Sequence, residues 1–319
     1  MKVAFVGKGG SGKTTMASLF ARRAVDAGRR VLAIDADINQ HLAGAFGLSE
    51  GEAARLPKLG EHLASIKDYL RGDNPRIASA EAMLKTTPPG HGSRLVDVAC
   101  SATVMRDLTT PVAGLRLAVT GGFTEDDLGV ACYHSKVGAV ELILNHLVDG
   151  DGEYVVVDMV AGAEAFASGM FTRFDRTFLV CEPTRRSVGV YHQYAEYAAE
   201  YDVAISVLGN KIDDAEDVRF LQSHVGEALL GWFGRSGYVK RAERGEPGPI
   251  GELEADGLAL LDRARDLVDI GGKDWGRFTR QAHEFHTRNA LAWGNGRSGV
   301  DLRDQIDPDF IMGSSVVAA

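Results

Sequence analysis

Apolar residues follow two patterns along the chain: some form short continuous runs, and others recur at helical spacing among polar residues. Short continuous apolar runs predict strands at residues 2–6, 31–34, 115–119, 154–157, 177–181 and 203–208. Apolar residues at helical spacing predict helices at 14–27, after Ser135, and at 251–268. Continuous rather than alternating apolar strands indicate burial on both faces of a parallel sheet. We therefore expect a single α/β domain with a doubly wound, mainly parallel sheet covered by helices.

Two stretches do not fit this alternation. Residues 48–95 contain polar helical pieces and the breaker Thr87-Pro88-Pro89-Gly90, which predicts a helical insert within a domain that spans residues 1–269. In residues 270–319 a set of mostly apolar residues recurs at helical spacing, so we expect a C-terminal helix followed by an irregular tail. The spaced residues are Trp275, Phe278, Ala282, Phe285 and Asn289.

Composition narrows the class of protein. The chain has 319 residues, of which 45% are hydrophobic and 25% charged, as is usual for a globular protein. No apolar run approaches the roughly 20 residues of a membrane-spanning helix, and we see no signal-peptide pattern. Three cysteines, Cys100, Cys132 and Cys181, are too few for a disulfide framework, so we expect a cytoplasmic location. The net charge of −9, from 35 basic and 44 acidic residues, argues against a broad nucleic-acid surface.

A glycine-rich motif lies between the first predicted strand and the first predicted helix. Residues Gly7-Lys8-Gly9-Gly10-Ser11-Gly12-Lys13-Thr14 match the phosphate-loop pattern G-x-x-x-x-G-K-[ST]. Glycines allow backbone N–H groups to turn inward around a phosphate, and the following helix adds the positive end of its dipole. We expect Lys13 to reach the β- and γ-phosphates of a nucleotide, the Thr14 hydroxyl to bind Mg²⁺, and Thr15 to meet the α-phosphate.

Candidate carboxylates follow two other predicted strands. Val155-Val156-Val157-Asp158 is an apolar strand that ends in a carboxylate, which is a Walker B pattern. We expect Asp158 to hold Mg²⁺ through water, beside Thr14. Asp35-Ala36-Asp37 follows the second predicted strand, and we expect Asp35 to be structural or to lie near the metal ion.

The additional lysine at position 8 makes the loop similar to the deviant Walker A motif of the MinD/ParA/nitrogenase-iron-protein class of ATPases. The resemblance implies that ATP closes a homodimer in which Lys8 crosses to the partner's nucleotide; the alternative is a solvated lysine. It also implies that Asp37 positions the attacking water, although Ile38 stands where the class often has proline. Asn210-Lys211 resembles the segment that contacts an adenine base, and the alternative there is a plain turn.

Three segments give a finer resemblance. They look most like the nickel-insertion accessory ATPases of carbon monoxide dehydrogenase, the CooC type. The segments are residues 158–164, which resemble switch II, residues 182–187 and residues 209–211. The likeness covers residues 1–268 apart from the insert. It implies an ATP-driven dimer that inserts nickel into, or matures, a client metalloenzyme. The alternative is a MinD- or ParA-type positioning or partition ATPase. Residues 311–319 contain no Lys or Arg, which argues against a basic amphipathic membrane helix.

A possible metal-binding pair lies before the Walker B strand. CooC-type proteins have Cys-x-Cys where this chain has Cys132-Tyr133-His134. If Ser135 caps the following helix, residues 132–134 are extended and the side chains of Cys132 and His134 point the same way. Two copies across a twofold axis would then supply two thiolates and two imidazoles to Zn²⁺ or Ni²⁺; the alternative is an ordinary core or interface pair. Ala161 stands where the nitrogenase iron protein has a cluster cysteine, so we expect no iron–sulfur cluster.

Overall fold

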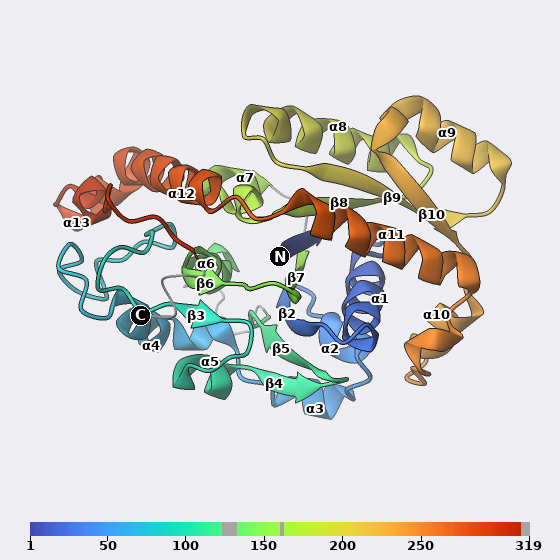
Figure 1. Ribbon diagram of the computed structural model, residues 1–319, viewed down its shortest axis with the longest axis horizontal. Helices are drawn as coiled ribbons and strands as arrows, with labels where there is room; N and C mark the ends of the chain where they lie inside the picture. The colour runs from blue at the N-terminus through green and yellow to red at the C-terminus, as the bar shows by residue number, and fades with distance from the viewer. Residues whose placement is uncertain (123–132, 160–162, 314–319) are drawn as a thin grey trace.

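The computed structural model describes residues 1–122, 133–159 and 163–313, with the backbone alone for residues 133–135, 163 and 164. The described elements form three layers, in which a central sheet has helices on both faces (Figure 1). No helix in this part of the chain is long and apolar enough to cross a lipid bilayer.

One eight-stranded sheet forms the middle layer. In sheet order its strands are β10 (Leu229–Gly234), β9 (Ile205–Ile212), β8 (Arg176–Cys181), β1 (Lys2–Val6), β7 (Glu153–Met159), β2 (Arg30–Ala36), β5 (Leu115–Val119) and β4 (Thr110–Val112). All neighbouring strands are parallel except β4, which is antiparallel to β5. A separate parallel pair consists of β3 (Val96–Asp97) and β6 (Leu147–Val148). The predicted doubly wound, mainly parallel sheet is confirmed.

The edge strands are the parts of the sheet that the apolar pattern did not predict. Strand β10 contains two glycines and from Gly231 onward alternates between buried and exposed positions, and β4 has only three residues, one of them Pro111. Strand β9 also extends beyond its predicted end, since Gly234 of β10 pairs with Ile212. Asn210 and Lys211 therefore lie inside β9, and the expectation that they follow the strand is wrong.

Helices cover the two faces of the sheet and bury separate apolar clusters. One face carries α1 (Lys13–Asp26), α2 (Leu42–Ala45), α3 (Glu50–Ala54), α10 (Gly237–Ala242) and α11 (Ala255–Gly271). The other face carries α4 (Leu63–Arg71), α5 (Thr103–Leu108), α6 (Tyr133–His146), α7 (Ala163–Ser168), α8 (Arg185–Glu200), α9 (Ala215–Val225) and α12 (Trp275–Asn289). A π-helical turn (Ala290–Gly294) and the short α13 (Asn295–Ser298) follow α12.

The carboxyl ends of the central strands meet at one edge of the sheet. Strand β1 lies at the position where the strand order reverses. Strands β7, β2 and β5 lie on one side of it, and β8, β9 and β10 lie on the other. Ligands of open α/β sheets bind at such a switch point. This edge holds the loop after β1, Asp35 near the end of β2, Asp37 directly after β2, and Asp158 near the end of β7.

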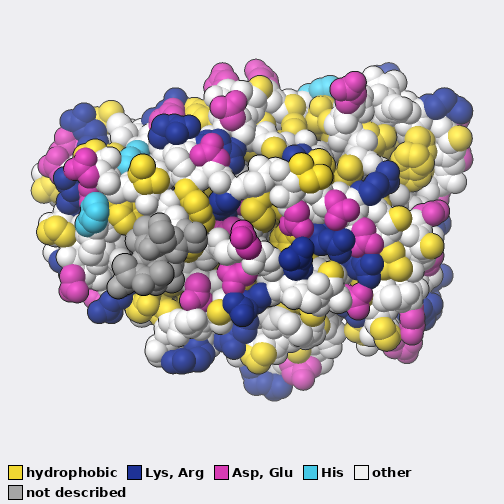
Figure 2. Space-filling view, viewed as in Figure 1, with side chains coloured by type: hydrophobic (Ala, Val, Ile, Leu, Met, Phe, Trp, Pro, Cys, Tyr) yellow, Lys and Arg dark blue, Asp and Glu magenta, His cyan; other side chains and the backbone are white. Residues whose placement is uncertain are grey.

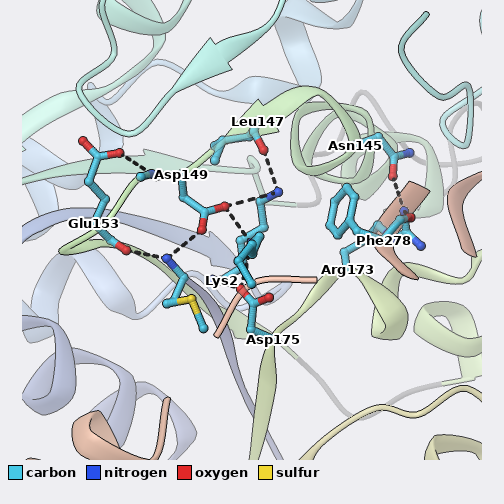
Figure 3. Close-up of polar contacts among 11 residues, drawn as sticks. Lys2, Asn145, Leu147, Asp149, Glu153, Arg173, Asp175 and Phe278 are labelled. Atoms are coloured by element: carbon cyan, nitrogen blue, oxygen red, sulfur yellow. Dashed lines mark hydrogen bonds and ion pairs between the residues drawn. The ribbon is translucent and has the colours of Figure 1, made fainter. Parts of the chain in front are cut away.

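A buried charged cluster closes the opposite, amino-terminal edge of the sheet (Figure 3). Lys2 is fully buried, and its Nζ donates to the Leu147 carbonyl at 2.6 Å and lies 3.6 Å from Asp149. Burial, and next the positive charge of Lys273, lower the pKa of Lys2 to about 7. Lys273 Nζ lies 2.8 Å from Asp149 and 2.7 Å from Asp175. These ion pairs fix the chain where it passes from α11 to α12.

The segment after α11 crosses this edge and joins the other helical layer. α11 packs with α1 on one face of the sheet, whereas Phe285 of α12 belongs to the core of the opposite face. The side chain of Phe285 fills the space above Gly169, where a Cβ would overlap its ring. On the outer surface shown in Figure 2, Lys and Arg side chains are interspersed with Asp and Glu.

Candidate functional site

The loop between β1 and α1 has the conformation that a phosphate cradle requires. Gly10 and Gly12 have φ angles of 81° and 95°, in the left-handed region that favours glycine. The backbone N–H of Ser11 donates to the Lys8 carbonyl at 3.1 Å. Gly7 approaches its neighbours closely, since a Cβ there would lie 2.6 Å from the Val180 carbonyl oxygen. The loop is therefore held by backbone geometry that other residues would strain.

Lys13 is buried at the start of α1 and forms an ion pair with Asp37. Its Nζ lies 3.2 Å from Asp37 Oδ2, and both side chains are almost fully buried. Asp37 Oδ1 also accepts from the backbone and side-chain nitrogens of Asn39 at 3.0 and 3.1 Å. Both residues were expected at the site, but their ion pair with each other was not predicted.

Thr14 and Asp158 are in direct contact, as a shared magnesium site requires. The Thr14 hydroxyl donates to Asp158 Oδ2 at 2.6 Å, and Asp158 is fully buried. Its other oxygen, Oδ1, is buried without a hydrogen-bond partner among the described residues. Burial raises the pKa of Asp158 to about 6. A buried carboxylate with an unpartnered oxygen beside a threonine hydroxyl fits the oxygen-rich coordination of Mg²⁺.

Asp35 lies beside Asp158 in the parallel register of β2 and β7. It is fully buried, and burial followed by the negative charge of Asp158 raises its pKa to about 8. Asp35 Oδ2 accepts from the Leu42 N–H at 2.9 Å, and Oδ1 accepts from the Asp37 N–H at 3.2 Å. Asp35 therefore holds the backbone of the segment that carries Asp37, which is the structural role expected for it.

Strand β9 reaches the phosphate loop from the other side. Asn210 Nδ2 donates to the Ser11 carbonyl at 2.7 Å, and Lys211 Nζ donates to the Gly10 carbonyl at 2.6 Å. Lys211 also pairs with Glu182 at 2.6 Å. No site role was predicted for Glu182, although its position directly after β8 is a signal that could have placed it at this edge of the sheet. Asn210 and Lys211 thus brace the loop.

The remaining residues of the phosphate loop vary in exposure. Gly9 and Gly10 are exposed, Lys8 and Thr15 are half-buried, and Ser11 is buried. Among the described residues, the Lys8 ammonium has no hydrogen bond or ion pair. The loop therefore presents one uncommitted cation beside its exposed glycines.

The predicted Cys132–His134 pair is not described in full. Cys132 lies outside the described residues, and His134 is described by its backbone alone. Helix α6 begins at Tyr133, so the expectation that Ser135 caps the helix after an extended 132–134 segment is wrong. In the described parts of the chain, no group of three or more His, Cys, Asp or Glu side chains could hold a metal ion.

Comparison with known proteins gives matches over most of the chain. The family model described as "CobQ/CobB/MinD/ParA nucleotide binding domain" matches residues 3–226. The carbon monoxide dehydrogenase accessory protein CooC of Rhodospirillum rubrum is 29% identical over 222 residues, which are 69% of this chain and 78% of that protein.

Two solved structures share the fold. A ParA family ATPase from Chlorobium tepidum TLS has a TM-score of 0.57 at 15% identity, and the match covers 83% of this chain and 98% of that one. The septum site-determining protein MinD of Pyrococcus horikoshii OT3, solved with Mg-ADP, has a TM-score of 0.55 at 15% identity and covers 86% of this chain and 100% of its own. At 15% identity, the similarity of this chain to these two structures shows a shared fold alone.

Proposed function

Since the chain is a P-loop ATPase that belongs to the CobQ/CobB/MinD/ParA nucleotide-binding family, we propose that it acts as an ATP-driven dimeric switch that delivers a nickel-type metal to a client metalloenzyme. The observation that carries the switch is Lys8, whose ammonium has no partner among the described residues, whereas Lys13 and Lys211 are both paired. The similarity to CooC, an accessory protein of carbon monoxide dehydrogenase, supports delivery to a client.

Lys13 and Asp37 exchange partners when a nucleotide binds. The phosphates of ATP replace Asp37 beside the Lys13 ammonium, because a phosphate offers more negative charge at the same buried position. Asp37, released from Lys13 but still held by Asn39, then positions the attacking water. Thr14 and Asp158 would hold Mg²⁺, which helps to neutralise the charge on the β- and γ-phosphates.

Lys8 acts across the dimer interface. Negative charge that develops on the γ-phosphoryl group is best stabilised by a cation that reaches it only when the dimer has assembled. Lys8 lies on the exposed side of the loop, beside Gly9 and Gly10, where a second copy of the chain could approach. The nucleotide base lies near β9, where the Asn210 amide donates to Ser11 and its oxygen can accept from the amino group of adenine.

Metal binding, which delivery requires, is tested by equilibrium dialysis of the full chain against Ni²⁺, and separately against Zn²⁺, with and without Mg·ATPγS. We expect about one metal ion per two chains, lost in Cys132→Ala and in His134→Ala. The matched control is Cys100→Ala, because Cys100 is buried and burial raises its thiol pKa. An equal, near-zero content in wild type and Cys132→Ala would remove metal binding by this pair from the proposal and leave the ATP switch standing.

A further inference from the structure

A cavity lies where the insert meets the C-terminal extension, and no residue of the phosphate loop lines it. Its volume is about 360 Å³, within the range of about 300–1,000 Å³ that small-molecule sites occupy. The walls come from α4, residues 81–85, Gly138 of α6, the π-helical turn, α13 and Leu302. Helices α4 and α13 lie at the same end of the molecule (Figure 1). None of these walls contributes to the ATPase chemistry derived above.

The charges that line this cavity are mostly positive. Lys67, Lys85 and Arg297 line it, against one acidic residue, Glu81. Lys85 pairs with Glu141 at 3.7 Å, but Lys67 and Arg297 have no hydrogen bond or ion pair among the described residues. Lys67 and Arg297 face the same cavity. Burial, and next the positive charge of Arg297, lower the pKa of Lys67, and the negative charge of Glu81 opposes this change. Three cations against one carboxylate on the wall leave a net positive charge in the cavity, and an anion stabilises such an arrangement.

The cavity also has an apolar wall with an exposed indole. Leu84, Trp293 and Leu302 line it, and the Trp293 side chain is 40% exposed. Trp293 Nε1 donates to Asn289 Oδ1 at 3.1 Å, which fixes the ring while leaving its faces available. Trp293 belongs to the π-helical turn, and π-helical turns are rare and frequently found at functional sites. Gly294 lets this turn approach Leu84, since a Cβ there would lie 2.8 Å from the Leu84 side chain.

We propose that this cavity is a second ligand site, which takes a small organic anion with a carboxylate, sulfonate or phosphate group and an apolar or aromatic body. The anionic group binds between Lys67 and Arg297, and the apolar body packs on Trp293 and Leu84. The site is separate from the nucleotide site, so its occupancy does not depend on the function proposed above.

The test is a fluorescence titration of the full chain with 8-anilinonaphthalene-1-sulfonate, an aromatic anion, in saturating Mg·ADP so that the nucleotide site is blocked. We expect saturable binding of one probe per chain. Arg297→Met and Lys67→Met remove one charge each at similar volume and should weaken binding about tenfold. The neutral analogue N-phenyl-1-naphthylamine should bind the wild type more weakly, and these variants should change its affinity less than twofold.

Arg288→Met is the matched control, because Arg288 is exposed on α12, pairs with Glu284 and does not line the cavity. It should bind both probes as the wild type does, and all variants should bind Mg·ATP normally. The proposal is overturned if the anionic probe shows no saturable binding. It is equally overturned if Arg297→Met and Arg288→Met bind the anion alike, or if the neutral analogue loses as much affinity as the anion.

Discussion

Gly12→Ala tests whether the phosphate loop works through its backbone conformation. Gly12 has φ 95° and ψ 21° immediately before α1. A Cβ at this position would also overlap Nδ2 of Asn210, whose hydrogen bond to the Ser11 carbonyl braces the loop. The substitution therefore strains the backbone and displaces Asn210 at the same time.

The expected cost follows from these two effects. A residue with a Cβ in the left-handed region costs about 1–2 kcal/mol, and loss of the Asn210–Ser11 hydrogen bond costs about 1 kcal/mol. A total of about 2–3 kcal/mol weakens nucleotide binding by about 30- to 150-fold. We expect this loss in the affinity for Mg·ATPγS, because the nucleotide must restore the strained conformation.

The assay is isothermal titration calorimetry of Mg·ATPγS into the full chain. Gly9→Ala is the matched control from the same loop, since Gly9 does not have a left-handed φ and a Cβ there would meet nothing within 4 Å. It should bind within about threefold of the wild type. The reasoning is refuted if Gly12→Ala also binds within threefold, or if both substitutions weaken binding equally.

Three further predictions concern charges buried in the described structure. Asp158→Asn should abolish Mg²⁺-dependent ATP hydrolysis, measured as phosphate release. The same substitution should stabilise the nucleotide-free protein at pH 7 by about 1–3 kcal/mol, measured by urea unfolding. The reason is that burial penalises the charge of Asp158 and raises its pKa to about 6. Lys273→Met should lower the free energy of unfolding by about 3 kcal/mol in the same urea assay, because it leaves the buried Asp149 and Asp175 without this partner. Burial lowers the pKa of His286 to about 4, so the unfolded state takes up its proton first and stability falls as pH drops from about 6.5 to 4. His286→Gln should flatten that part of the stability profile, and an unchanged slope would contradict the assignment.

The nucleotide site could be predicted from sequence because its signals are local. The phosphate loop, the Walker B carboxylate and the acidic pair at the end of β2 each follow a buried apolar run, and parallel strands bring their carboxyl ends to one edge. The contact between Thr14 and Asp158 follows from that rule, although 144 residues separate them. The pairing of Lys13 with Asp37 has no local signal, since it depends on which partner each buried charge finds.

Other parts of the fold depend on long-range packing. The cluster of Lys2, Asp149 and Lys273 joins three distant segments, and no periodicity marks these residues. Strand β10 pairs through residues that look like a loop, because Gly231 and Gly234 interrupt its apolar pattern. The π-helical turn is likewise invisible in the sequence, which simply continues the helical spacing of α12.

The claim at the centre of this account is that Lys8 couples ATP binding to dimerisation. Sedimentation velocity of the full chain with Mg·ATPγS tests it directly, with Lys240→Ala as a control for removal of an exposed lysine elsewhere. We predict that wild type and Lys240→Ala sediment as dimers with the nucleotide and as monomers without it, whereas Lys8→Ala binds the nucleotide and remains a monomer. A dimer of Lys8→Ala in Mg·ATPγS, or a wild type that stays monomeric, would contradict the claim.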